Sequence, residues 1–137
     1  MFCAGRLDEE SVRKLDDMAE IRDEVVSRLG KGDDCSEAWR IGNGMANEIG
    51  YSNHLMGMTP NQAVFLGHSV GLELDETPVV ADRFDRELPI GGTMAIEPKV
   101  IYDSGAIGTE DTFARTPDGM ECLTMGDSWS LLTEWDS

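Results

Sequence analysis

The chain has 137 residues, 40% of them hydrophobic and 28% charged, which is enough for one globular domain with a modest core. Its formal net charge of -16 argues against nucleic acid or an anionic membrane as the main partner, because both would repel it. The three cysteines, Cys3, Cys35 and Cys122, form no C-x-x-C pair and argue against a disulfide scaffold or a thiolate zinc site. With no signal-peptide pattern and no window resembling a membrane span, we expect a cytoplasmic protein.

A long amphipathic helix is predicted near the N-terminus. Asp8 can cap it, and an acidic first turn suits the positive end of the helix dipole. Apolar residues then recur at helical spacing between Val12 and Leu29. Gly30 and Gly32 are expected to end this helix.

A second helix is predicted from Ser36 to Ile49, with Gly50 as its stop. Gly42 and Gly44 lie inside it and weaken the prediction, since glycine destabilises a helix interior. The alternative interpretation is that they allow another element to approach the helix closely.

The rest of the chain has the pattern of a sheet. Residues 51–62 and 81–88 are expected to be loops, and Thr116-Pro117-Asp118-Gly119 has the residue order of a type I turn. The extended segments are expected at 93–96, at 100–102 after a break at Pro98, at 105–115 and at 120–124. Helices followed by strands indicate an α+β domain, with two helices packed on an antiparallel sheet.

Of the two histidines, His54 lies in a polar loop and is most simply a surface or hydrogen-bonded residue. His68 lies between Gly67 and Ser69-Val70-Gly71, at the end of an apolar run. Glycines beside it let the backbone come close to a ligand and let the imidazole point into a cavity. A histidine in such a setting is nevertheless more often structural than catalytic.

Two glutamates occupy unusual positions. Glu97 ends the run Met94-Ala95-Ile96, and Glu110 follows Gly108-Thr109. If the two lie on neighbouring antiparallel strands, their 13-residue separation (110 minus 97) can bring both carboxylates to one point. An imidazole with two carboxylates would suit manganese, cobalt, zinc or iron(II). The alternative is a polar core in which all three are simply hydrogen-bonded.

Three segments together resemble the pita-bread metallopeptidases, the family of Xaa-Pro dipeptidase, aminopeptidase P and methionine aminopeptidase, and of creatinase, which shares the fold without the metals. The segments are Gly67-His68-Ser69-Val70-Gly71-Leu72-Glu73-Leu74-Asp75-Glu76, Ala95-Ile96-Glu97-Pro98-Lys99 and Gly108-Thr109-Glu110-Asp111-Thr112. The resemblance implies the C-terminal half of the pita-bread fold. It also implies that His68 and Glu97 each ligate one metal and that Glu110 bridges two, which would activate a water and polarise a scissile carbonyl.

The sequence also departs from the family pattern. The family's two aspartate ligands lie upstream of the first helix, and this sequence contains no counterpart of them. Accessory histidines of the prolyl-peptidase branch would fall at Val64 and Asp75, and an arginine of aminopeptidase P would fall at Gly108. Ser69 stands where the family usually has glycine. Because Asp75 stands at the position of a family catalytic histidine, we assign no catalytic residue. Metal binding is expected to be weak or absent.

These points lead to two expectations for function. The first is a partial or degenerate Xaa-Pro dipeptidase- or aminopeptidase-like hydrolase with little or no activity alone, formed by a partial catalytic domain (1–124) and an acidic tail (125–137). The second is a non-catalytic module that binds a peptide or small ligand. In either case the sheet face that an N-terminal half would cover is expected to be hidden, by that half or by a homodimer.

Overall fold

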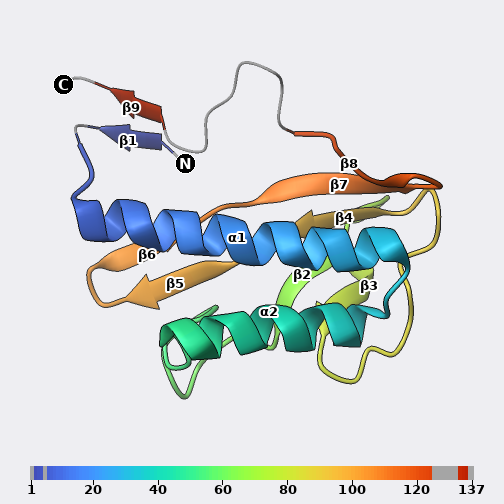
Figure 1. The fold of residues 1–137 in the computed structure, drawn as a ribbon, viewed down its shortest axis with the longest axis horizontal. Helices are drawn as coiled ribbons and strands as arrows, with labels where there is room; N and C mark the ends of the chain where they lie inside the picture. The colour runs from blue at the N-terminus through green and yellow to red at the C-terminus, as the bar shows by residue number, and fades with distance from the viewer. Residues whose placement is uncertain (1, 5, 125–132, 136–137) are drawn as a thin grey trace.

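The computed structural model describes residues 2–4, 6–124 and 133–135, and confirms an α+β fold of two helices packed on an antiparallel sheet (Figure 1). The helices are α1 (Glu9–Lys31) and α2 (Cys35–Ile49). The strands are β1 (Phe2–Ala4), β2 (Phe65–Ser69), β3 (Glu76–Ala81), β4 (Thr93–Ile96), β5 (Lys99–Tyr102), β6 (Gly105–Gly108), β7 (Asp111–Thr116), β8 (Gly119–Cys122) and β9 (Thr133–Trp135).

Helix α1 begins where the sequence predicts. The backbone N–H of Ser11 donates to the Asp8 carboxylate at 2.7 Å, which caps the first turn. Gly32 ends the helix in the left-handed conformation, with φ of 93°. Gly30, expected to end it, instead lies within the last turn.

Helix α2 begins one residue before its predicted start and ends at Gly50, whose φ is 105°. The question about its glycines is answered differently at each position. A Cβ at Gly42 would lie 2.7 Å from Leu66 Cδ1 and 2.8 Å from Val25 Cγ2, so this glycine allows α2 to pack closely against β2 and α1. A Cβ at Gly44 would meet nothing within 4 Å.

The main sheet has five strands in the order β3-β2-β4-β7-β8, and every neighbouring pair is antiparallel. The hairpin predicted around residues 116–119 is confirmed as β7–β8. Strand β3 was not predicted. The short strands β1 and β9 pair in parallel, and this places part of the predicted tail beside the N-terminal segment.

One predicted strand was wrong. Residues 105–115 were expected to form a single strand, but they form β6 and β7, which belong to different sheets and are separated by Thr109 and Glu110. Strand β6 pairs with β5, and β7 pairs with β4. The partner segment is interrupted at Glu97-Pro98, and proline cannot donate a backbone hydrogen bond to a ladder. The break in one segment therefore matches the break in the other.

Side-chain alternation gives the five-stranded sheet two different faces. Met94, Ile96 and Phe113 belong to one buried cluster with Met18 and Val25 of α1, so this face of the sheet packs against the helices. Because alternate residues of a strand point to opposite sides, Ala95 belongs to the other face. Figure 1 shows α1 and α2 side by side on the sheet.

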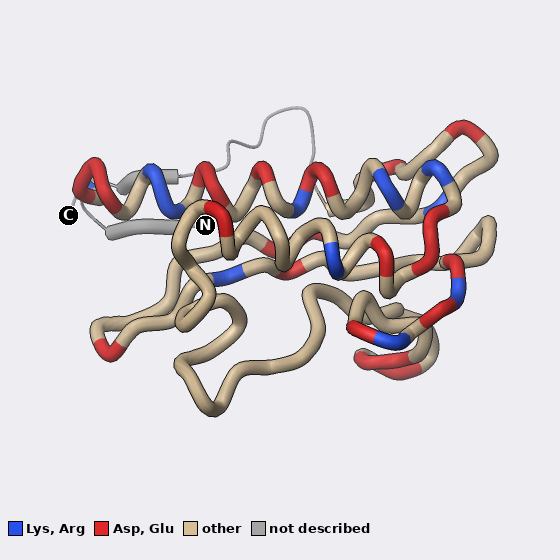
Figure 2. The backbone as a smooth tube through the Cα atoms, turned by 60° about the horizontal axis from the view of Figure 1, so that its bottom comes forward, with Lys and Arg blue, Asp and Glu red and all other residues tan. Residues whose placement is uncertain are grey.

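The acidic residues are spread along both helices and through the loops, with fewer basic residues among them (Figure 2). On α1 the charges follow the helix dipole, with Glu9 and Glu10 in the first turn and Arg28 and Lys31 in the last. Among the residues that the structure describes, no helix is long and apolar enough to cross a membrane.

The two glycines of α2 give a matched test of this packing. Gly44→Ala is expected to raise the free energy of unfolding by up to about 1 kcal/mol, because alanine is the better helix former and has free space there. Gly42→Ala gains the same propensity but overpacks the contact with α1 and β2, at a cost of about 1–3 kcal/mol. Urea unfolding of both variants measures the difference, and equal stabilities would show that α2 does not pack as closely as described.

Candidate functional site

Of the three residues expected to bind metal, two lie at the breaks between strands and one lies within a strand. His68 is in β2, Glu97 follows β4, and Glu110 precedes β7. In β2 and β4, His68 pairs with Ala95, so its side chain belongs to the same face as Ala95, the face turned away from the helices. Glu97, two residues after Ala95, is expected on that face as well.

The strand register places Glu97 opposite Glu110. Ile96 pairs with Asp111 on one side of the break, and Lys99 pairs with Gly108 on the other. The two residue numbers add to 207 in both pairs, so the register is the same on both sides of the break. The numbers of Glu97 and Glu110 also add to 207, which places these two residues opposite one another. The backbone N–H of Thr109 donates to the Pro98 carbonyl at 3.2 Å, so the same register continues across the break. Residues opposite one another in antiparallel segments share a face, so Glu97 and Glu110 are expected on the same face.

His68 is buried, and two carboxylates approach its ring. Its Nε2 lies 3.1 Å from Asp75 Oδ1 and 3.5 Å from Glu97 Oε1, while its Nδ1 is 3.2 Å from the Ser69 carbonyl. By the family resemblance, Asp75 stands at the position of a catalytic histidine. In this structure it contacts the histidine expected to bind metal. The Ser69 hydroxyl is buried and has no hydrogen-bond partner in the part of the chain that the structure describes.

The second oxygen of Glu97 is occupied by a lysine that the sequence interpretation did not consider. Lys99 Nζ donates to Glu97 Oε2 at 2.5 Å. The Glu97 side chain is only 12% exposed, so its charge needs a nearby cation. Lys99 also lines a small hollow together with Gly108 and Glu110.

As they stand, these residues do not fit a dinuclear metal centre. Among residues 6–124, no group of three or more His, Cys, Asp or Glu side chains lies close enough to hold a metal ion. His68 Nε2 lies 3.5 Å from one oxygen of Glu97, and the Lys99 ammonium holds the other oxygen. The ligand types suit a divalent cation, but the carboxylate of Glu97 is already bound by the ammonium of Lys99.

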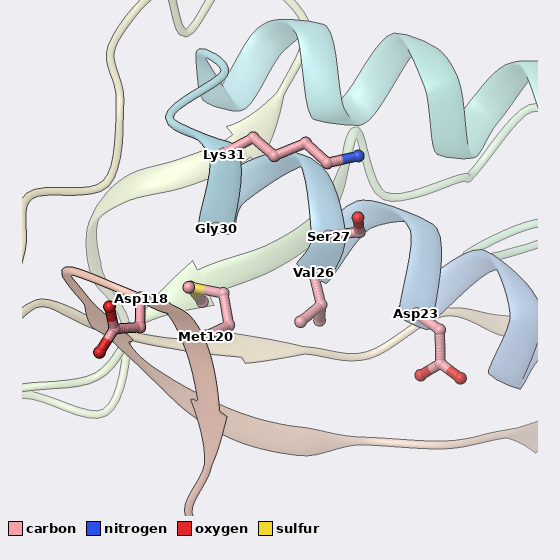
Figure 3. A pocket seen from close by; sticks show the side chains of 8 residues that line it. Asp23, Val26, Ser27, Gly30, Lys31, Asp118 and Met120 are labelled. Carbon is pink, nitrogen blue, oxygen red and sulfur yellow. The ribbon is translucent and has the colours of Figure 1, made fainter.

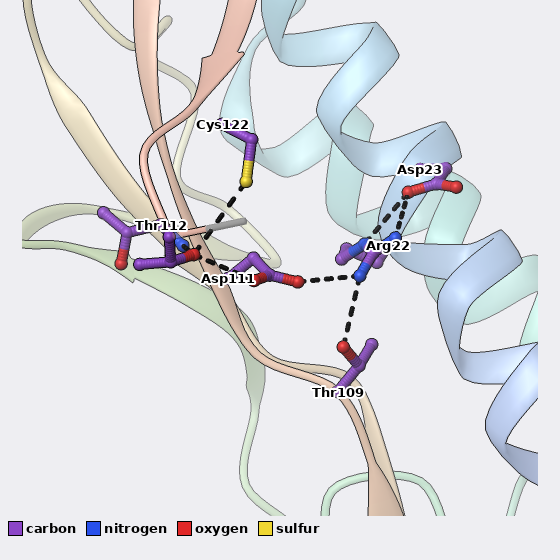
Figure 4. A network of polar contacts seen from close by, with 7 residues as sticks. Arg22, Asp23, Thr109, Asp111, Thr112 and Cys122 are labelled. Atoms are coloured by element: carbon purple, nitrogen blue, oxygen red, sulfur yellow. Dashed lines mark hydrogen bonds and ion pairs between the residues drawn. The ribbon is translucent and has the colours of Figure 1, made fainter. Parts of the chain in front are cut away.

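Beside the expected site lies a buried polar network that sequence reasoning missed (Figure 4). Arg22 Nη1 of α1 donates to Asp111 Oδ2 at 2.7 Å and to Thr109 Oγ1 at 3.2 Å. The Thr124 hydroxyl donates to the other Asp111 oxygen at 2.8 Å. Asp111 is thus turned toward the helix, whereas the neighbouring Glu110 belongs to the other face.

A signal for this network was present in the sequence. Arg22 falls on the apolar stripe of the first helix, between Met18 and Val25, at helical spacing. A charged residue at such a position is buried and needs an acidic partner. Which acid it meets depends on the register of β7, and the sequence does not specify that register.

Two other candidates from the sequence have structural roles. His54 Nδ1 lies 2.9 Å from the Ile101 carbonyl, and its ring stacks on Tyr102, so the interpretation of His54 as a hydrogen-bonded residue is confirmed. Cys35 is buried, and this burial raises the pKa of its thiol to about 11. A thiol with such a pKa is protonated at neutral pH and is not a nucleophile.

A larger hollow of about 430 Å³ lies elsewhere, between the end of α1 and the β7–β8 hairpin (Figure 3). Val26 and Met120 form its apolar part, and Asp23, Lys31 and Asp118 are at its margin. It contains none of the residues expected to bind metal, and its mixed charges indicate no particular ligand.

The comparisons with known proteins agree with this architecture. The model of metallopeptidase family M24 matches residues 1–117. The X-Pro aminopeptidase from Thermotoga maritima is similar over 96% of this chain and 35% of its own, with 20% identity and a TM-score of 0.81. The prolidase from Pyrococcus horikoshii OT3 matches 90% of this chain and 34% of its own, with 27% identity and a TM-score of 0.76. The methionine aminopeptidase from Thermotoga maritima matches 89% and 55%, with 21% identity and a TM-score of 0.63.

The fold and the spaced segments therefore define part of a pita-bread peptidase domain. Because the family model matches most of the sequence, the chain belongs to metallopeptidase family M24. It spans about a third of the length of the X-Pro aminopeptidase and prolidase structures that it matches. No curated protein was found to match it.

The buried ion pair gives a direct test of the site's framework. Asp111→Ala is expected to lower the free energy of unfolding by about 3–5 kcal/mol, because it removes the buried partner of Arg22. Asp23→Ala removes a carboxylate that contacts the same guanidinium at 2.8 Å but is 65% exposed, and should cost less than about 1 kcal/mol. Urea unfolding compares the two, and a similar loss in both would mean that the buried pair does not hold α1 to β7.

Proposed function

We propose that this chain carries the C-terminal part of a Xaa-Pro dipeptidase- or aminopeptidase-like site, and that the 137 residues alone hydrolyse peptides little or not at all. The observation that carries this proposal is the register that places Glu97 opposite Glu110, with His68 3.5 Å from Glu97. The names of the similar structures, X-Pro aminopeptidase and prolidase, support the substrate class. Manganese, cobalt, zinc and iron are the candidates for the metal of such a site. We also propose a cytoplasmic location.

The expected lack of activity has three supports. The sequence has no counterpart of the two aspartate ligands implied by the family resemblance, and Asp75 stands at the position of a proton-transferring histidine. Loss of one such donor typically reduces the rate by about 10²–10³-fold. In addition, Glu97 is engaged by Lys99.

A second candidate function is a non-catalytic module that binds a peptide or small ligand. It is favoured by the contact of His68 Nε2 with Asp75 at 3.1 Å, because this histidine and Glu97 both have partners without a metal. Such a module would bind Xaa-Pro dipeptides without hydrolysing them.

The first proposal is tested with an Ala-Pro dipeptide in the presence of added manganese or cobalt. Hydrolysis is measured as the amount of free proline released. We expect no turnover above that of the metal in buffer. Metal-dependent turnover that disappears in His68→Ala would contradict the proposed inactivity. Calorimetric titration with the same dipeptide examines the second candidate, which is excluded if no heat of binding is detected at millimolar peptide.

The proposed partner is either a second copy of the chain or an N-terminal half such as the longer relatives contain. One support for this is the sheet face turned away from the helices. The other is a set of exposed apolar side chains just before and just after β2 in the sequence, Val64, Leu72 and Leu74. Sedimentation equilibrium measures the oligomeric state. We expect a species of about twice the 15.0 kDa chain mass, and a monodisperse monomer would exclude the homodimer.

A further inference from the structure

We propose that the ammonium of Lys99 takes the place of a metal cation beside Glu97 and Glu110, so that a divalent ion binds there only when Lys99 is released. Lys99 then acts as a built-in counter-ion of the site. The proposal concerns metal binding alone and does not depend on whether the chain hydrolyses peptides.

The direct contact is the first support. Lys99 Nζ lies 2.5 Å from Glu97 Oε2, and the two side chains are 32% and 12% exposed. Such a charge-assisted hydrogen bond between partly buried groups neutralises the carboxylate. The other oxygen of Glu97 lies 3.5 Å from His68 Nε2, so both Glu97 oxygens already have a partner.

Strand alternation gives the second support. Lys99 comes two residues after Glu97, so both side chains are expected on the same face of the strand. Lys99 is paired with Gly108, and Glu110 comes two residues after that glycine. Lys99 and Glu110 line one hollow of about 190 Å³. Lys99 therefore contacts Glu97 directly and lines the same hollow as Glu110.

The electrostatics of the register is the third support. Two carboxylates directly opposite one another on antiparallel strands destabilise the sheet, and a cation near both relieves this repulsion. In a metallopeptidase the cation would be the metal. In this chain the nearby cation is Lys99, which contacts Glu97 and lines a hollow with Glu110.

The neighbouring glycine fits the same interpretation. A Cβ at Gly108 would lie 2.4 Å from Lys99 Cβ and 2.5 Å from the Pro98 carbonyl oxygen. The position where aminopeptidase P would have an arginine thus has no room for a side chain beside Lys99. No second cationic side chain can enter from position 108, and Lys99 faces the hollow without a competitor from that position.

The test is a titration of the whole chain with Mn²⁺, with free Mn²⁺ measured by electron paramagnetic resonance. Lys99→Gln and Lys99→Met are expected to bind Mn²⁺ at least about tenfold more tightly than the unmodified chain, because each frees Glu97 for a metal. Lys99→Arg keeps the charge and should leave binding weak. Lys31→Gln, at the distant end of α1, removes the same charge and serves as the matched control.

The gain must also depend on Glu97. Adding Glu97→Gln to Lys99→Gln is expected to abolish the tighter binding. The proposal is overturned if Lys99→Gln and Lys99→Met bind Mn²⁺ no more tightly than Lys31→Gln. It is equally overturned if the gain persists without Glu97, since the ion would then be bound elsewhere.

Discussion

The architecture of the candidate site depends on one antiparallel register, which is kept across a break in the strands. The β4–β7 pair and the β5–β6 pair belong to different sheets, yet their paired residues are in one continuous register. The interruption at Glu97-Pro98 and Thr109-Glu110 removes regular strand geometry without shifting the alignment. Glu97 and Glu110, at the two ends of the segment that contains β5 and β6, are therefore brought opposite one another.

Because side chains alternate along the strands, the candidate site residues and the residues that pack against α1 lie on opposite faces of the sheet. Residues on one face join α1 through apolar contacts and through the buried Arg22–Asp111 pair. Residues on the other face include His68, and by register Glu97 and Glu110. Adjacent acids such as Glu110 and Asp111 consequently have different surroundings, one turned to the helix and one turned away.

Much of the fold could be predicted from the sequence because its signals are local. Apolar spacing, the Asp8 cap and the glycine stops define both helices, and the turn at residues 116–119 defines a hairpin. The division of residues 105–115 into two strands could not be predicted, because it depends on which strands pair with this segment. Strand β3 was missed because residues 76–81 follow a charged, glycine-containing stretch and their burial depends on α2.

For the site, the family resemblance supplied the residues but not their neighbours. The sequence indicated that His68, Glu97 and Glu110 belong together. The structure brings His68 within 3.5 Å of Glu97, and metal binding by the three residues stays a prediction. It did not indicate that Lys99 would bind Glu97, because the direction of a lysine side chain after a proline is set by the strand that follows. The contact between Asp75 and His68 is likewise a result of the loop between β2 and β3.

The buried link between α1 and the start of β7 has a mechanical consequence. Arg22 holds both Thr109 and Asp111, the residues on either side of Glu110, to the middle of the long helix. Opening of this part of the sheet must then break the same ion pair that opening of the helix would break, which is the condition for one cooperative unfolding unit. Disruption of the backbone around Glu110 is thereby coupled to disruption of α1, although the segment has no regular secondary structure of its own.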